Sequence, residues 1–179
     1  MRKYTEDYEN VVTMDDKGKE QTTAVYRGVY FEINLEEEEL RRVKRNSLIL
    51  LGAVILLHLL AGFVGNKGMY QYYVSLPYVV AFFPLLYLAL GLFLLPREKR
   101  KYRRDEVGHS YYRARTSSLV LLIFLSIAVL GTIGFTLFGA EPGTRMLEYL
   151  FLSYEIPAVA ANLILSSLLR KIKIQACEK

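Results

Sequence analysis

Two ionisable side chains stand inside long apolar segments, where an unpaired charge is costly. His58 lies six residues before the end of the run 47–64, and Glu155 lies eight residues after the start of the run 147–169. At 1.5 Å per residue both are roughly 9–12 Å from the same edge of an apolar layer. A carboxyl group at that depth is neutral unless it is paired, so its proton could be exchanged for a cation or passed to a neighbour.

A stripe of polar residues follows one side of the segment that contains Glu155. Its members are spaced by seven, seven and four positions: Glu148, Glu155, Asn162 and Ser166. On a helix with about 3.6 residues per turn they fall within about 40° of one another, so they must face protein or water rather than lipid. Three interpretations follow. Glu155 and His58 form a protonatable or cation-binding site, or Glu155 hydrogen-bonds His58 or Asn162 and holds a bundle together, or the stripe contacts a partner's helix.

No other chemistry is indicated. His109 and the single cysteine, Cys177, lie at spacings unrelated to His58, so we expect neither a catalytic set nor a metal site. No glycine-rich phosphate-binding loop is present in the sequence. The sequence therefore predicts a protein without enzymatic activity, cofactor or metal.

Four apolar runs position these side chains. They cover residues 47–64, 73–95, 118–138 and 147–169. Each has about 18–23 residues, enough to cross roughly 30 Å of hydrocarbon as a helix. Each is continuously apolar rather than alternating, which favours helices over a barrel. The sequence therefore predicts an all-α membrane protein with a bundle of four transmembrane helices.

Basic residues are distributed unevenly between the connections. Of the 23 Lys and Arg residues, all but Lys67 and Arg145 lie in segments 1–46, 96–117 and 170–179. The positive-inside bias places these three segments, and so both termini, in the cytosol. We expect a multi-pass protein of the plasma membrane whose net charge of +5 attracts anionic lipid head groups rather than nucleic acid.

Tyrosines gather around the start of the second run. Tyr70, Tyr72, Tyr73 and Tyr78 stand near its start, on the side opposite the cytosol. Tyrosine is enriched at membrane–water interfaces, where the ring is buried and the hydroxyl stays wet. This grouping predicts an interfacial belt.

The first 34 residues follow a strand pattern instead. Residues 10–14, 21–26 and 29–33 are β-prone and are separated by turn-forming residues, which predicts a small three-stranded antiparallel meander with one apolar face. About 27 residues cannot bury enough surface to fold alone. The meander should therefore rest on the membrane surface, the 96–117 loop, a second copy or another protein; a disordered tail is the alternative.

A helix should begin directly after this segment. Asn34 can cap it, and Glu37 stands where it would close a capping box. The helix is expected to continue through the basic residues 41–45 into the first apolar run without a break.

Two regions result: a cytosolic β-meander at 1–34 and a four-helix transmembrane domain at 35–179. The latter includes the cytosolic loop 96–117 and the tail 170–179. Without a catalytic motif, the pattern favours an accessory or regulatory subunit that acts through contacts within a homo-oligomer or with another membrane protein. The alternative is a small proton- or cation-coupled transporter that uses Glu155.

Overall fold

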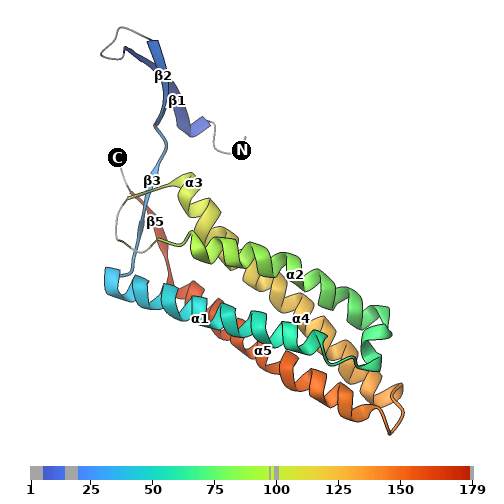
Figure 1. Cartoon of the computed structure of the whole chain (residues 1–179). Coiled ribbons are helices and arrows are strands. Elements are labelled where there is room, and N and C mark those ends of the chain that lie inside the picture. The colour runs from blue at the N-terminus through green and yellow to red at the C-terminus, as the bar shows by residue number, and fades with distance from the viewer. Residues whose placement is uncertain (1–5, 15–19, 97, 99–100, 178–179) are drawn as a thin grey trace.

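Four long helices dominate the computed structural model, which describes residues 6–14, 20–96, 98 and 101–177. They lie side by side, with small β-sheets at one end (Figure 1). The helices are α1 (Glu37–Gly62), α2 (Tyr72–Phe93), α4 (Arg113–Phe138) and α5 (Arg145–Lys171). A short 3₁₀ turn, η2 (Lys67–Tyr70), precedes α2.

Each long helix coincides with one of the four predicted apolar runs. Within the described residues, these four helices are long and apolar enough to cross a membrane, so the prediction of four helices of that kind is confirmed. A short helix, α3 (Arg104–Val107), and a π-helical turn, η3 (Gly108–Tyr112), lead without interruption into α4.

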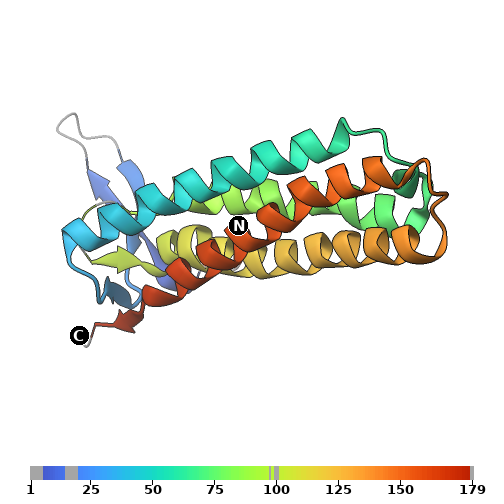
Figure 2. The ribbon, with the colours of Figure 1, turned by 90° about the horizontal axis from the view of Figure 1, so that it is seen from below.

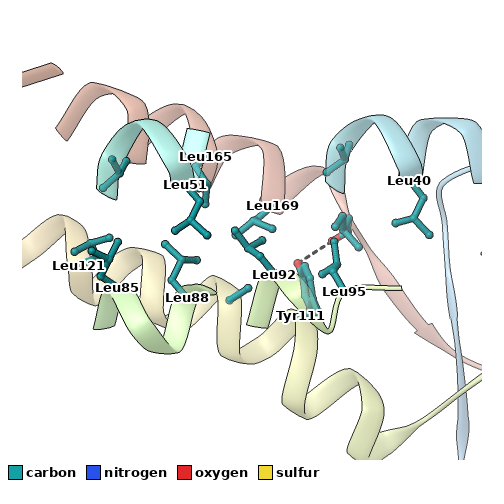
Figure 3. Packing of buried hydrophobic residues seen from close by; sticks show 14 of the residues in the cluster. Leu40, Leu51, Leu85, Leu88, Leu92, Leu95, Tyr111, Leu121, Leu165 and Leu169 are labelled. Carbon is teal, nitrogen blue, oxygen red and sulfur yellow. Dashed lines mark hydrogen bonds between the residues drawn. The ribbon is translucent and has the colours of Figure 1, made fainter. Parts of the chain in front are cut away.

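The bundle is built from two close pairs of helices. α1 packs along α5 and α2 packs along α4, while α4 and α5 join the pairs. In Figure 2, α5 runs between α1 and α4. Each helix contributes leucines to one apolar core, among them the buried Leu51, Leu88, Leu121 and Leu165 (Figure 3). In lipid, such packing acts through close van der Waals contact rather than through exclusion of water.

The β-strands form two separate sheets. β1 (Tyr8–Met14) and β2 (Glu20–Tyr26) make an antiparallel hairpin in which Tyr8 lies opposite Tyr26. β3 (Tyr30–Ile33) is the middle strand of a second sheet, between β4 (Tyr102–Arg103) and β5 (Ile174–Ala176).

The prediction of a three-stranded meander is therefore wrong in its third strand. The first two strands pair as expected, but β3 leaves the hairpin and pairs with the loop after α2 and with the chain's tail. The physical reason is burial: Ile33 is buried in the bundle core and Phe31 packs against it. β4 and β5 have only two and three residues, too short to give a strand signal in the sequence.

The first helix begins later than predicted. Glu36, not Asn34, precedes its first turn, and no side chain caps it. The Asn34 side chain instead accepts a hydrogen bond from the backbone N–H of Lys173 at 2.7 Å, and the Asn34 N–H donates to the Lys173 carbonyl at 3.1 Å. Asn34 does not cap α1 because it forms these two hydrogen bonds with the tail instead. The expected continuity through residues 41–45 is confirmed.

Candidate functional site

The packing of α1 on α5 brings the two intramembrane ionisable residues together. His58 Nδ1 and Glu155 Oε1 are 2.7 Å apart, and both side chains are fully buried. Either the imidazole N–H donates to the carboxylate or the carboxyl O–H donates to the imidazole. The similar depth of His58 and Glu155 in their apolar runs suggested that they could be in contact. The contact forms because α1 and α5 are neighbours in the bundle.

Aromatic rings from α2 hold the imidazole in place. The centroid of the His58 ring lies 4.2 Å from that of Tyr78 and 4.6 Å from that of Phe82. The Tyr78 hydroxyl donates a 2.6 Å hydrogen bond to the His58 carbonyl. Phe151 of α5, itself fully buried, packs on Tyr78. The pair is thus enclosed by rings and shielded from water, where electrostatic interactions are strongest.

The prediction that Tyr78 belongs to the interfacial belt is wrong. Tyr70 and Tyr72 are 83% and 78% exposed, as an interfacial belt requires, whereas Tyr78 is only 5% exposed. Tyr78 stands nearly two turns deeper than Tyr72 and shares a helix face with Phe82, four residues on. This spacing was the available signal for its role beside His58.

Each member of the pair keeps one polar atom without a hydrogen-bond partner. These atoms are His58 Nε2 and Glu155 Oε2, both buried. Buried polar atoms are usually paired, so exceptions require an explanation. The ring nitrogen and the carboxylate oxygen are both atoms that can take up or release a proton.

The remainder of the polar stripe is also turned inward. Asn162 Nδ2 donates to the Ser118 carbonyl of α4 at 2.9 Å, and the hydroxyls of Ser166 and Ser118 are 2.9 Å apart. Both stripe residues are buried. They join α5 to α4, as hydrogen bonds between transmembrane helices commonly do.

Glu148 lies at the far end of the bundle and binds the connection between α1 and α2. Its carboxylate accepts hydrogen bonds from the Gly68 N–H, at 2.8 Å, and from the Asn66 side chain. The side chain is fully buried against the connection between α1 and α2. Glu148 therefore fixes this connection.

All four stripe residues are buried within a single chain. The interpretation that the stripe contacts a partner's helix is therefore wrong, because α1, α4 and the connection before α2 already cover it. No group of three or more metal-binding side chains occurs among the described residues. What the arrangement offers chemically is one hydrogen-bonded imidazole–carboxyl pair that can share, accept or release a proton.

Comparisons with protein-family models, curated proteins and solved structures gave no match to this chain.

Proposed function

We propose that the protein is a non-enzymatic membrane protein that acts as an accessory or regulatory subunit, with the β1–β2 hairpin as its contact surface. One observation supports this above the others: the hairpin projects from the end of the bundle as a sheet of only two strands (Figure 1). We also propose that this end and both termini lie in the cytosol, because the basic segments gather there, and that the membrane is the plasma membrane.

Hydrogen bonds fix the base of the hairpin to the helical bundle. The Tyr8 hydroxyl donates to Asp105 Oδ2 at 3.0 Å, and the Arg104 N–H donates to the Tyr26 hydroxyl at 3.1 Å. Burial, and then the contact with Asp105, raise the pKa of Tyr8, so that its phenol stays protonated and can donate. Since Arg104 and Asp105 belong to the extension of α4, the hairpin is oriented by the bundle.

Beyond this base, the hairpin has little to stabilise it. A hairpin of two strands is marginally stable alone in water. Val12 of β1 is 59% exposed and Val25 of β2 is 38% exposed, on opposite faces. Each strand also has an outer edge of backbone groups to which a further strand can hydrogen-bond. A strand from a second copy or from another membrane protein would use these groups.

The experiment is purification in mild detergent, followed by mass spectrometry and measurement of particle mass. We expect a stoichiometric partner or a homo-oligomer with the full chain, and its loss when residues 1–26 are removed, which leaves β3 in place. Val12→Lys should weaken the same association because charge on an edge strand opposes pairing, while Val12→Thr serves as the matched control. Unchanged composition and mass after the deletion would refute the proposal.

Anionic lipid is the second partner that we propose at this end. A groove of about 480 Å³ is lined by Arg41, Lys44, Arg45, Leu48 and Ile49 of α1. Arg45 has no ion-pair partner in the described part of the chain, and apolar side chains follow one turn deeper. This order of charge and apolar surface suits a phospholipid with an anionic head. Arg45→Gln should retain less anionic lipid after delipidation than the control Arg170→Gln, measured by lipid mass spectrometry.

A small proton- or cation-coupled transporter is the second candidate function. The observation that favours it is the buried His58–Glu155 pair with its two unpartnered atoms. Reconstitution into vesicles with a pH gradient tests it: Glu155→Gln should abolish flux, whereas removal of residues 1–26 should leave flux intact. Unchanged flux with Glu155→Gln would exclude this function.

A further inference from the structure

A cavity of about 390 Å³ lies where the second sheet meets the ends of α2 and α5. We call it the platform cavity. Its wall is mainly apolar and includes Ile33, Leu95, Tyr102, Tyr111 and Ile172. Figure 3 shows Tyr111 beside Leu95; the Tyr111 hydroxyl donates to the Ile172 carbonyl at 2.7 Å, so it is already satisfied. Size and lining are those of a small-molecule site.

One side of the platform cavity is polar. Asp105, Glu106, His109 and Ser110, all from the α3–η3 segment, line it. Asp105 Oδ2 accepts the hydrogen bond from the hairpin, but Asp105 Oδ1 is buried without a hydrogen-bond donor. Asp105 Oδ1 forms an ion pair with Arg103 Nε, but their separation of 3.7 Å is longer than a hydrogen bond. A ligand that supplies a donor would remove this deficit.

The backbone of this wall is irregular. Residues Gly108–Tyr112 form a π-helical turn inside an otherwise α-helical segment. Such turns are rare and occur frequently at functional sites, because the wider turn changes the direction of the side chains that follow. Here the turn contributes His109, Ser110 and Tyr111 to the cavity wall.

We propose that the platform cavity binds a small amphiphile with an apolar body and a primary ammonium head that donates to the Asp105 carboxylate. Among the described lining residues, Asp105 and Glu106 have acidic side chains and none is Lys or Arg; Arg103, which pairs with both carboxylates, is not part of the lining, so an anionic head would meet like charge. The apolar body would lie against Leu95 and Ile172, at the ends of two membrane helices. Amphiphiles concentrate at this level of a bilayer.

Ligand binding would act on the attachment of the hairpin. The carboxylate that meets the ammonium head also accepts the Tyr8 hydrogen bond, so the ligand and the hairpin share Asp105. This regulatory consequence rests on the proposed function, whereas binding itself does not. The two are distinguishable, because binding is measured on the isolated protein and recruitment of a partner by co-purification.

The test uses the full chain in nanodiscs of zwitterionic lipid, titrated calorimetrically with octylamine, octanol and octanoate, with empty nanodiscs subtracted. We expect saturable octylamine binding at least tenfold tighter than octanoate binding, with octanol between them. Asp105→Asn should weaken octylamine binding at least tenfold, about 1.4 kcal/mol. Glu141→Gln, which removes an acidic group near Lys67 at the opposite end, is the control and should change nothing.

Ser110→Leu provides an independent variant. The Ser110 hydroxyl donates only within its own helical segment, to the Glu106 carbonyl, so its loss should be tolerated while the larger side chain fills the cavity. Saturable binding should then disappear. Octanoate binding as tight as octylamine, an unchanged affinity in Asp105→Asn, or full binding by Ser110→Leu would each overturn the proposal.

Discussion

Replacing one member of the His58–Glu155 pair with an apolar residue should destabilise the protein more than replacing both. His58→Phe preserves the ring contacts with Tyr78 and Phe82, and Glu155→Met preserves an unbranched side chain of similar length. Each single variant leaves one fully buried polar group without its partner, at a cost of about 1–3 kcal/mol. The double variant removes both groups, and apolar replacement of a buried pair is often neutral or stabilising.

The size of the coupling follows from geometry. Hydrogen bonds to charged groups contribute about 1.5–3 kcal/mol, whereas those between helices in one membrane protein averaged about 0.6 and reached about 1.7. The 2.7 Å separation and complete burial place this pair at the upper end. We expect a coupling free energy of about 2 kcal/mol, roughly a 30-fold effect on the unfolding equilibrium.

The assay is a double-mutant cycle. The parent, both single variants and the double variant are unfolded in mixed micelles with increasing SDS, and the loss of helical circular dichroism gives each free energy of unfolding. A parallel cycle pairs Glu155→Met with Ile123→Val, an exposed residue of α4, and should be additive. Additivity within about 0.5 kcal/mol in the His58–Glu155 cycle itself would refute the reasoning.

Three further outcomes concern the packing, the tail and its thiol. Gly131→Val should cost about 1–3 kcal/mol in the same SDS assay, because a Cβ there would lie 3.0 Å from a carbonyl of α2, whereas Gly134→Val, with nothing within 4 Å, should change little. Burial and the nearby Glu32 carboxylate raise the pKa of Cys177, which lowers its thiolate fraction; alkylation at pH 8 should be slower than for a free cysteine peptide, and Glu32→Gln should accelerate it. Asn34→Ala removes the side-chain oxygen that accepts a hydrogen bond from the backbone N–H of Lys173 in the tail. Hydrogen exchange in β5 should therefore become faster, without change in the four long helices.

The helices were predictable because each run carries its own signal. Length and continuous apolarity identify a membrane-spanning helix without reference to the rest of the chain. The inward direction of the stripe at Glu155 and Asn162 also followed from the helical period, since lipid could not accept it. Neither inference needed knowledge of which helices are neighbours.

The errors all concern contacts between distant segments. β3 leaves the hairpin because two very short strands, 69 or more residues away in sequence, complete its sheet. Asn34 serves the tail rather than its own helix for the same reason. Tyr78 lies beside His58 rather than in the interfacial belt, because its position depends on how α1 and α2 approach each other. A local sequence pattern cannot predict such pairings, because the partner residue lies far outside the segment in which the pattern occurs.

The same distant contacts determine how the hairpin is held. α1 and α5 are joined at one end through β3 and β5, in the middle through His58 and Glu155, and at the far end through the Glu148 carboxylate. α2 and α4 form the other close pair, and α4 carries the segment that binds the hairpin base. The hairpin is therefore connected covalently to the first pair through β3 and by hydrogen bonds to the second. A displacement of one pair against the other would act on both attachments, so the two pairs give a change at the buried His58–Glu155 contact a physical route to the hairpin.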